Sequence, residues 1–435
     1  METVLKVTAS DDVDERDNRF VPKIPKTLEE TGINEILLED LIFKLLLSQG
    51  VLSGWHIAQE ICLPFKILEK VLEDLKKRML LGHRSTTGLN DFTYILTEEG
   101  RKKAVVARNA SAYIGAAPVS FNEYLKSVEQ QSILKESPKQ DDLKRAFSDL
   151  VLEPSIIDTL GPALNSGRGV FLYGDPGNGK TSIAKRIYKC FREEIYIPKT
   201  LLIEGQLVKL FDPQCHEPTD LSDKKPVSYD QRWVRIKRPA VIVGGEMDLS
   251  SVEINYNPSN KLCEAPMQLK ANCGIFVVDD FGRQRMKPED LLNRWILPLE
   301  KRIDFLTLPN GIKVQVPFDE LVIFCTNIDP KNLLDEAFLR RIPYKIRVYD
   351  PSPEQFKNIM TFLAPQYGVE CNDSIIAYII ERHFNGKRPM RCCHPRDILT
   401  QVVNAAAYRR TDPVLTRDFI DFACKSYFTA MESIK

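Results

Sequence analysis

The clearest repeat of apolar positions lies between Pro64 and Leu81. Apolar residues recur there at steps of three and four residues, and basic residues occupy the positions between them. The apolar set is Leu68, Leu72, Leu75 and Met79, and the basic set is Lys66, Lys70, Lys77 and Arg78. This pattern predicts an amphipathic helix with a basic outer side. Two shorter apolar helices are expected before it, around 36–47 and 54–61.

A two-stranded hairpin is predicted directly after these three helices. Residues 82–84 precede a turn-rich cluster, and the strand-like run Phe92 to Leu96 follows it. Three helices followed by a hairpin over residues 27–110 resemble a winged helix. The acidic segment 1–26, interrupted by Pro22 and Pro25, is expected to be a flexible arm.

Strand-like and helical runs alternate over residues 146–350. The pairs are 169–173 with 182–191, 274–278 with 288–300, and 321–325 with 333–341. Such alternation predicts an α/β domain, in which a parallel sheet carries helices on both faces. The polar segment 111–145 is expected to be a linker, and residues 351–435 to form a smaller helical domain.

A phosphate-binding loop follows the first of these strands. Its sequence matches G-x-x-x-x-G-K-[ST] at every fixed position, between the apolar strand 170–173 and a helix. Loop N–H groups and the helix N-terminus supply positive partial charge, Lys180 is expected to reach the outer phosphates, and Thr181 to bind Mg²⁺. The candidate nucleotide-binding residues are Gly174, Asp175, Pro176, Gly177, Asn178, Gly179, Lys180, Thr181 and Ser182.

Two carboxylates end the apolar run Gly274 to Val278, about 100 residues after the loop. This arrangement resembles a Walker B strand. On that reading Asp279 holds Mg²⁺ together with Thr181, and Asp280 polarises the attacking water. The usual pair is Asp-Glu. Aspartate is shorter by one methylene group, so slow hydrolysis or a nucleotide switch remains an alternative.

The combined motifs resemble the AAA+ ATPases, over roughly residues 145–430. The resemblance implies that Asn327, which follows the strand 321–325, is the sensor 1 residue that orients the lytic water. It implies that Arg340 and Arg341 are arginine fingers, which reach the ATP of a neighbouring subunit. A surface pair at a helix C-terminus is the alternative for these two. The run 394–399 resembles sensor 2, in which Arg396 turns toward the nucleotide in a helical lid.

Two further segments are candidates for contacts with a substrate. The run 305–314 carries an Asn-Gly hairpin signal and resembles the hairpin inserted before sensor 1 in one AAA+ branch. The segment 200–270 reads as an insertion, and its basic and aromatic run 232–238 either contacts a phosphate backbone or forms a solvated strand face.

Composition narrows the class of protein. Sixty basic residues balance sixty acidic ones, so the chain as a whole has no field that would recruit nucleic acid or an anionic membrane. No apolar stretch reaches the roughly 18 residues of a membrane span, and a cytoplasmic protein without membrane contact is expected. The ten cysteines form no C-x-x-C pair and are expected to be reduced thiols. Cys392, Cys393 and His394 lack ordinary zinc spacing.

Three functions are consistent with these features. The first is an ATPase that uses ATP and Mg²⁺ in a homo-oligomeric, hexameric ring to remodel a protein client, with the winged helix as adaptor. The second is a DNA-directed ATPase, whose winged helix contacts the duplex. The third is a scaffold that binds ATP and hardly hydrolyses it. Residues 27–110 contain 11 Lys or Arg against 12 Asp or Glu, which favours a protein client over DNA.

Overall fold

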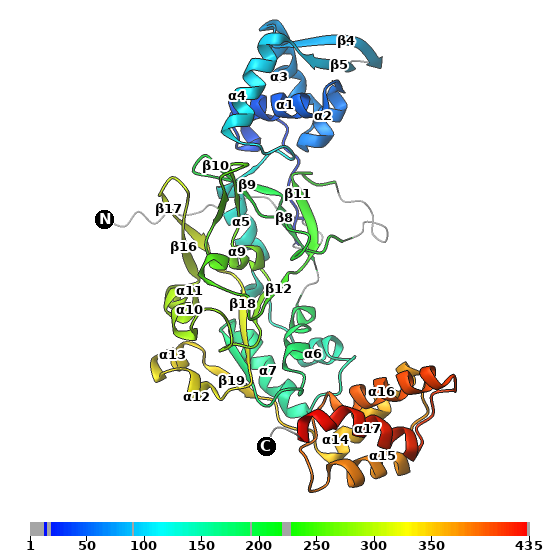
Figure 1. Cartoon of the computed structure of the whole chain (residues 1–435). Coiled ribbons are helices and arrows are strands. Elements are labelled where there is room, and N and C mark those ends of the chain that lie inside the picture. The colour runs from blue at the N-terminus through cyan, green and yellow to red at the C-terminus, as the bar shows by residue number, and fades with distance from the viewer. Residues whose placement is uncertain (1–12, 15–18, 89–90, 192–193, 220–227, 433–435) are drawn as a thin grey trace.

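The computed structural model describes residues 13–14, 19–88, 91–191, 194–219 and 228–432. Figure 1 shows a helical unit at the top, a central body built on sheets, and a group of helices at the lower right. Most of the predicted flexible arm, residues 1–26, lies outside the described residues. Phe20 lies inside them and packs edge-on against Trp233 of the body, with ring centroids 5.5 Å apart.

The N-terminal unit, residues 27–110, contains the predicted three helices and hairpin. The helices are α1 (Glu35–Gln49), α2 (Gly54–Ile61) and α3 (Phe65–Lys77), and the hairpin is β4 (Leu81–Gly88) with β5 (Asp91–Leu96). A short strand, β3 (Leu52–Ser53), and a fourth helix, α4 (Glu98–Ala110), complete the unit and were not predicted. The apolar stripe of α3 faces inward, and Leu68, Leu72 and Leu75 are fully buried.

The predicted linker 111–145 is not a free connector. It contains β6 (Val119–Ser120), α5 (Phe121–Gln131) and α6 (Gln140–Ala146). Tyr124 and Val128 of α5 are buried in the core of the body. The prediction was wrong because these two apolar positions, one helical turn apart, lie among polar residues that dominate the composition.

A five-stranded parallel sheet forms the lower body, in the order β12-β15-β18-β7-β19. Val170 and Leu172 of β7 face one core with α7 and α8, and Phe171 faces the other core with α10. Helices therefore cover both faces, and the α/β prediction is confirmed. The strands are β7 (Val170–Tyr173), β12 (Ala240–Val243), β15 (Ile275–Val278), β18 (Leu321–Thr326) and β19 (Tyr344–Arg347). The helices are α7 (Pro154–Ser166), α8 (Lys180–Ala184) and α10 (Pro288–Arg294).

The predicted insertion 200–270 contributes to three different sheets. Its strand β12 pairs with β15 and is the edge of the parallel sheet. Other strands build an upper sheet in the order β13-β14-β10-β9-β6, and β8 pairs with β11. These strands are β8 (Glu194–Pro198), β9 (Thr200–Ile203), β10 (Gln206–Lys209), β11 (Trp233–Lys237), β13 (Asn255–Asn257) and β14 (Leu262–Glu264), followed by the short helix α9 (Met267–Ala271).

The basic and aromatic run 232–238 is neither a solvated face nor a surface for phosphate. The side chains of Arg232, Arg235 and Arg238 are buried and form ion pairs with Asp230, Glu194 and Glu136 respectively. A buried cation is tolerated only when it is paired, so these arginines hold the body together.

Arg232 also connects the body to both ends of the N-terminal unit. Its Nη1 donates to the carbonyl of Thr31, near the start of the unit, at 2.7 Å, and to the carbonyl of Pro118, just after the unit, at 3.2 Å. Strand β6 begins at the next residue and pairs in parallel with β9. The chain is thus fixed to the body where it enters the unit and where it leaves it.

The predicted hairpin around Asn310-Gly311 is present. Strands β16 (Ile303–Thr307) and β17 (Lys313–Pro317) are antiparallel, and Thr307 lies opposite Lys313. Gly311 has a φ of 83°, the left-handed conformation that glycine adopts readily. Phe305 and Ile312 are exposed on this hairpin.

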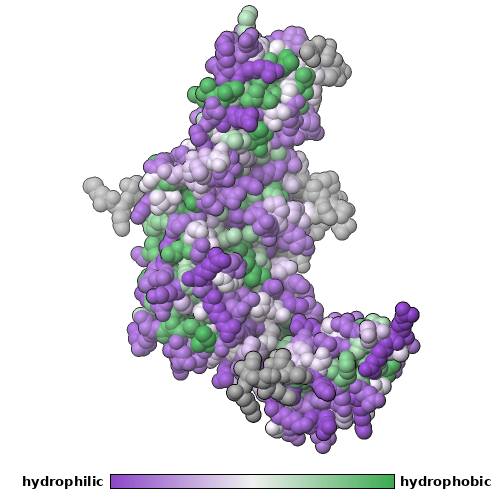
Figure 2. Space-filling view, viewed as in Figure 1, coloured by the Kyte–Doolittle hydropathy of each residue, from purple (hydrophilic) through white to green (hydrophobic). Residues whose placement is uncertain are grey.

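The C-terminal part, residues 351–435, is helical over its described residues, as predicted. Its α-helices are α14 (Pro353–Leu363), α15 (Asp373–Ile379), α16 (His394–Arg409) and α17 (Arg417–Glu432). They pack around a core of their own that includes Phe356, Leu399 and Phe428, and Figure 2 shows them as a separate lobe. All ten cysteines are free thiols. Among the described residues, no helix combines the length and apolarity needed to cross a bilayer.

Candidate active site

The sheet topology brings the predicted motifs to one edge. The phosphate-binding loop follows β7, Asn327 follows β18, and Asp279 with Asp280 follows β15. Strand β18 lies between β7 and β15, and all three run in parallel. Their carboxyl ends therefore meet at the same edge, where open α/β sheets commonly bind ligands.

Close packing explains two of the loop glycines. Gly174 has a φ of 137°, and a Cβ atom there would lie 2.3 Å from the carbonyl oxygen of Val348. Gly177 has a φ of 84°, and a Cβ atom there would lie 2.7 Å from Cys393 Sγ. The loop is thus wedged between the end of β19 and the start of the C-terminal helices, and only glycine fits at these points.

Lys180 lies at the start of α8 and points back into the loop. Its Nζ donates to the carbonyls of Gly174 and Asp175, both at 2.9 Å, and to Asn327 Oδ1 at 2.6 Å. Burial lowers the pKa of this ammonium, although the nearby carboxylates oppose the shift. The lysine is therefore preorganised beside the loop backbone, where an anionic ligand would compensate its burial.

A hydroxyl and a carboxylate meet beside this lysine. Thr181 Oγ1 donates to Asp279, at 2.8 and 2.9 Å from the two carboxylate oxygens. Hydroxyl and carboxylate oxygens are ligands that Mg²⁺ prefers, so this pair fits the predicted metal site. Ser182 is the next residue of α8, and its carbonyl accepts from Arg186 Nη1 at 2.9 Å.

Asp280 and Asn327 form the outer part of the site. Asn327 Nδ2 donates to Asp280 Oδ1 at 3.4 Å, while its Oδ1 accepts from Lys180. Asp280 has a φ of 49° and an exposed side chain. The amide of Asn327 therefore connects the candidate base to the candidate phosphate-binding lysine, and both can reach a ligand at this edge.

The two candidate arginine fingers lie on α13 (Glu336–Arg341), away from these contacts. Arg340 is exposed and pairs with Glu336 at 2.9 Å, one turn earlier on the same helix. Arg341 pairs with Glu300 at 2.7 Å. Exposed pairs of this kind contribute little to stability, so both guanidinium groups can exchange their partners at low cost.

The C-terminal part contacts the loop through Arg391, a residue that was not predicted. Arg391 Nη1 lies 2.8 Å from Asp175 Oδ2 and also pairs with Asp350, which follows β19. Arg396, predicted for the nucleotide contact, is 61% exposed and pairs with its sequence neighbour Asp397. The structure therefore brings Arg391, rather than Arg396, against the loop. Asp350 lies shortly after a strand, as Asp279 does. This position in the sequence could have identified Asp350 as a further residue at the sheet edge.

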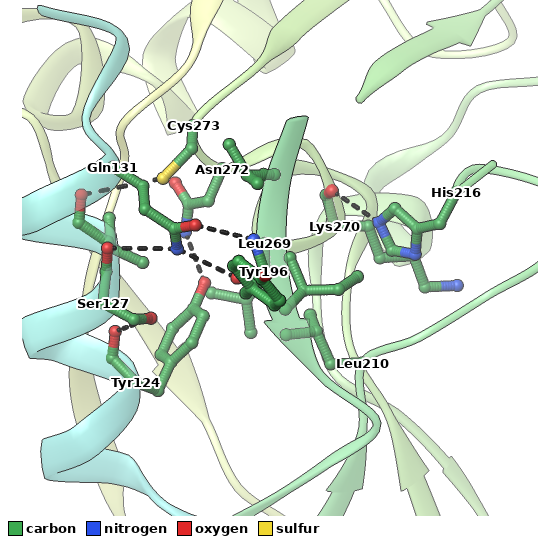
Figure 3. Close-up of a pocket in the computed structure, with 13 residues that line it drawn as sticks. Tyr124, Ser127, Gln131, Tyr196, Leu210, His216, Leu269, Lys270, Asn272 and Cys273 are labelled. Carbon is green, nitrogen blue, oxygen red and sulfur yellow. Dashed lines mark hydrogen bonds between the residues drawn. The ribbon is translucent and has the colours of Figure 1, made fainter. Parts of the chain in front are cut away.

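A small closed cavity lies elsewhere in the body, beneath α5 (Figure 3). Its polar groups satisfy one another. Asn272 donates to the hydroxyl of Tyr124 at 2.8 Å, and Gln131 exchanges hydrogen bonds with the backbone of Tyr196. No residue of the phosphate-binding loop lines this cavity. It is a packing feature rather than a ligand site.

Apart from the residues at the edge of the parallel sheet, one group of side chains could hold a metal ion in the part of the chain that the structure describes. Glu35, Glu39 and Asp74 place oxygens within 4.8 Å of one another. Arg78 already pairs with Glu39 and Asp74, so two of these three carboxylates have a partner in the protein itself. Cys392, Cys393 and His394 form no such group among the described residues.

Comparison with known proteins gives three findings. Residues 352–426 match the family model of a domain of unknown function, DUF8689. A stretch of 50 residues is 46% identical to a vesicle-fusing ATPase of Dictyostelium discoideum. The match covers 12% of this chain and 6% of that protein, so the chain matches only a small part of its relative.

Solved structures give more extended but weaker likenesses. NtrX from Brucella abortus is 15% identical, with a TM-score of 0.40 over 74% of this chain and 66% of its own. A variant of RuvB from Thermotoga maritima is 14% identical, with a TM-score of 0.35 over 68% of this chain and 72% of its own. A second RuvB variant has a TM-score of 0.38 at 13% identity, over 64% and 71%.

Proposed function

We propose that this chain is an AAA+ type ATPase, which binds MgATP at the edge of the parallel sheet and hydrolyses it. The observation that carries this proposal is the presence of two hydrogen-bonded pairs at this edge, Lys180 with Asn327 and Thr181 with Asp279. These residues come from three strand ends, so their juxtaposition is a property of the fold. The 50-residue likeness to an ATPase supports the same assignment.

Each residue then has a defined task. The loop N–H groups and Lys180 bind the phosphates, and Thr181 with Asp279 holds Mg²⁺. Asp280 accepts a proton from the attacking water, and Asn327 orients that water. Bound Mg²⁺ would neutralise the charge on the phosphate oxygens. The protein supplies mainly position and electrostatic stabilisation, as phosphoryl transfer requires.

The work done with ATP is proposed to be remodelling of a protein partner by a homo-oligomeric ring, expected to be hexameric. Arg340 and Arg341 would complete the site of the adjacent subunit. The C-terminal helices would act as the lid, and the β16–β17 hairpin, with exposed Phe305 and Ile312, would face the substrate.

A protein client is favoured over DNA by the surface of the N-terminal unit, the proposed winged helix. Apolar side chains are exposed on it, among them Ile36, Trp55 and Val106, and Figure 2 shows an apolar band on its visible face. Exposed apolar side chains suit a protein partner, whereas a duplex requires a clearly basic face.

DNA is the second candidate, because Lys66, Lys70 and Lys77 are exposed on α3. Fluorescence anisotropy with random duplex DNA over a salt series separates the two candidates. Binding that weakens steeply with added salt would support the DNA-directed function, since phosphate contacts release counterions. Absence of binding at low salt would support the protein client.

ATP binding is tested by calorimetry of Lys180→Ala with MgATP. We expect the affinity to fall by roughly a hundredfold or more, because a buried ammonium makes charge-assisted hydrogen bonds to phosphate that alanine cannot replace. Lys185→Ala is the matched control, since Lys185 is exposed just after α8. Equal affinities for the wild type and Lys180→Ala would contradict the assignment of the loop.

A further inference from the structure

Three successive residues of the C-terminal part contact three residues of the phosphate-binding loop. Arg391 pairs with Asp175. The N–H of Cys392 donates to Asn178 Oδ1 at 3.3 Å, and the N–H of Cys393 donates to the carbonyl of Gly177 at 2.9 Å. These contacts are formed by the loop positions that the motif leaves unspecified (x in G-x-x-x-x-G-K-[ST]). A change in the conformation of the loop would therefore change the contacts of the C-terminal part directly.

Asp350 reinforces this junction from the sheet. Its carboxylate accepts from Asn178 Nδ2 at 2.7 Å and pairs with Arg391. Asn178 is buried, while Asp175 is half-exposed. Arg391 therefore has two carboxylate partners, of which Asp350 is 35% exposed and Asp175, in the loop, is 52% exposed. The half-exposed pair is the weaker of the two and the easier to exchange.

Asp175 places a negative charge inside the phosphate-binding loop. The loop is proposed to bind a polyphosphate, and a carboxylate beside the phosphates would repel them. In the structure, Arg391 neutralises this carboxylate at 2.8 Å. An arriving phosphate group would compete with Asp175 for the same guanidinium, and Arg391 can bind phosphate in the bidentate manner typical of arginine.

We propose that Arg391 is the residue through which the C-terminal helices respond to the bound nucleotide, and that Asp175 competes with the phosphates for its guanidinium. The proposal rests on the proposed ATP binding and assigns to Arg391 the role expected of Arg396. The exchange from Asp175 to phosphate would shift the segment 391–393, and with it α16, which begins at His394.

The test measures the discrimination between nucleotides in the full-length protein. Affinities for Mg-AMP-PNP and Mg-ADP are measured by calorimetry for the wild type, Arg391→Gln, Asp175→Asn and Arg396→Gln. Arg391→Gln should weaken AMP-PNP binding about tenfold and ADP binding much less, because one charged hydrogen bond to the outer phosphate is lost. Asp175→Asn should tighten AMP-PNP binding several-fold, since the competing carboxylate is removed.

Three additional variants exclude a merely structural role. Arg391→Lys keeps the charge and should restore part of the discrimination, while Arg410→Gln changes an exposed arginine after α16 and serves as the control. In the double variant of Arg391→Gln and Asp175→Asn, the change in AMP-PNP affinity should differ from the sum of the two single effects, because Asp175 acts on the nucleotide both directly and through Arg391. Melting temperatures establish that each variant is folded.

The proposal is overturned if Arg391→Gln leaves the ratio of the two affinities unchanged, or if Arg396→Gln alone abolishes it. Failure of the proposed ATP binding has a different signature, since the wild type would then bind neither nucleotide. Weakening of both nucleotides by the same factor in Arg391→Gln would show that Arg391 only supports the loop, and would also overturn the proposal.

Discussion

Asn327 is the residue on which the geometry of the site depends most. Its amide accepts from Lys180 and donates to Asp280, so a single side chain fixes the distance between the phosphate-binding cation and the candidate base. The short aspartate in the place of a glutamate is thus held by a side chain that already contacts the lysine. A longer base is not required for contact with the rest of the site.

Asp280→Asn should retain MgATP binding and lose turnover, by roughly two to four powers of ten, the usual contribution of a general base. The proposed metal ligand Asp279 and the loop are unchanged in this variant. Steady-state phosphate release and calorimetry measure the two quantities, and Asp290→Asn, an exposed aspartate of α10, is the control. Turnover at the wild-type rate would place the base elsewhere. A wild type that binds ATP but releases no phosphate would identify the scaffold function instead.

His394 predicts a loss of stability in acid. Burial lowers its pKa to about 4, and its Nδ1 accepts from the N–H of Arg391 at 3.0 Å. The unfolded chain therefore binds a proton near pH 6.5, at which the folded chain still does not. The contribution of the neutral ring to stability is complete above pH 6.5 and is lost as the pH falls toward 4.

The measurement is the denaturant midpoint at pH 7 and pH 4.5 for the wild type and His394→Asn, whose amide oxygen can accept the same hydrogen bond. The wild type should lose more stability than the variant over this interval, since only the histidine titrates. Other titrating groups contribute equally to both proteins. Equal losses would show that His394 is solvated or already charged in the folded protein.

The sequence was sufficient to expect that the candidate residues in short local motifs lie close together. Asp279 follows a strand directly, Lys180 and Thr181 follow one after the loop 174–179, and the strands were recognisable as apolar runs. Arg391 could not be found in this way, because its partner Asp175 lies 216 residues earlier, the difference between their positions in the chain. The Arg-Asp pair at 396–397 carried the stronger motif, but in the structure these two residues pair with each other.

At the scale of elements, the loop is confined by its neighbours. Gly174 packs on the backbone of Val348 and Gly177 on Cys393, so β19 and the C-terminal helices limit its conformations from two sides. A loop confined in this way loses little entropy when a ligand orders it.

Gly174→Ala should therefore destabilise the protein by several kcal/mol. A φ of 137° is strained for alanine, and its Cβ would overlap a backbone oxygen that cannot move freely. Gly386→Ala is the matched control, because Gly386 also has a positive φ, 67°, but a Cβ there meets nothing within 4 Å. The control should lose only about 1–2 kcal/mol in chemical denaturation. Losses of equal size would mean that the contact with Val348 relaxes easily.

Element boundaries were predicted less well than element types. A helix was expected over residues 182–191, but α8 ends at Ala184 and a separate 3₁₀ turn covers Ile187–Cys190. The side chain of Arg186 donates to the carbonyl of Ser182, a group that would otherwise accept a helical backbone hydrogen bond. Some strands of the upper sheet, such as β14, were missed because their pairing is non-local, as between β10 and β14.

At the scale of the whole molecule, the candidate arginine fingers lie apart from the candidate site. The loop, the proposed metal ligands and the proposed base meet at the sheet edge, while Arg340 and Arg341 lie on α13 with partners of their own. A guanidinium group at the transferred phosphate stabilises the transition state strongly, and we expect Arg340 and Arg341 to reach that phosphate only in a neighbouring subunit.

Mixing two inactive proteins tests this arrangement. Lys180→Ala and the double variant of Arg340→Ala with Arg341→Ala should each be inactive alone, and activity should partly return in mixed oligomers, where some interfaces pair an intact loop with intact arginines. Removal of the arginines alone should lower turnover by about three to five powers of ten and affect binding weakly. Mixed oligomers without activity would contradict the role of the arginines, and an active monomer would contradict the ring.

The attachment of the N-terminal unit has a mechanical consequence. A unit joined by one free linker could rotate independently, and a rotation of the body would not be transmitted to it. Here the guanidinium of Arg232 holds the carbonyls of Thr31 and Pro118 together, and β6 extends the upper sheet directly from the second of these points. Two fixed points resist torque where one does not. A rotation of the sheet would therefore be transmitted to the far end of the unit as the displacement of a lever arm.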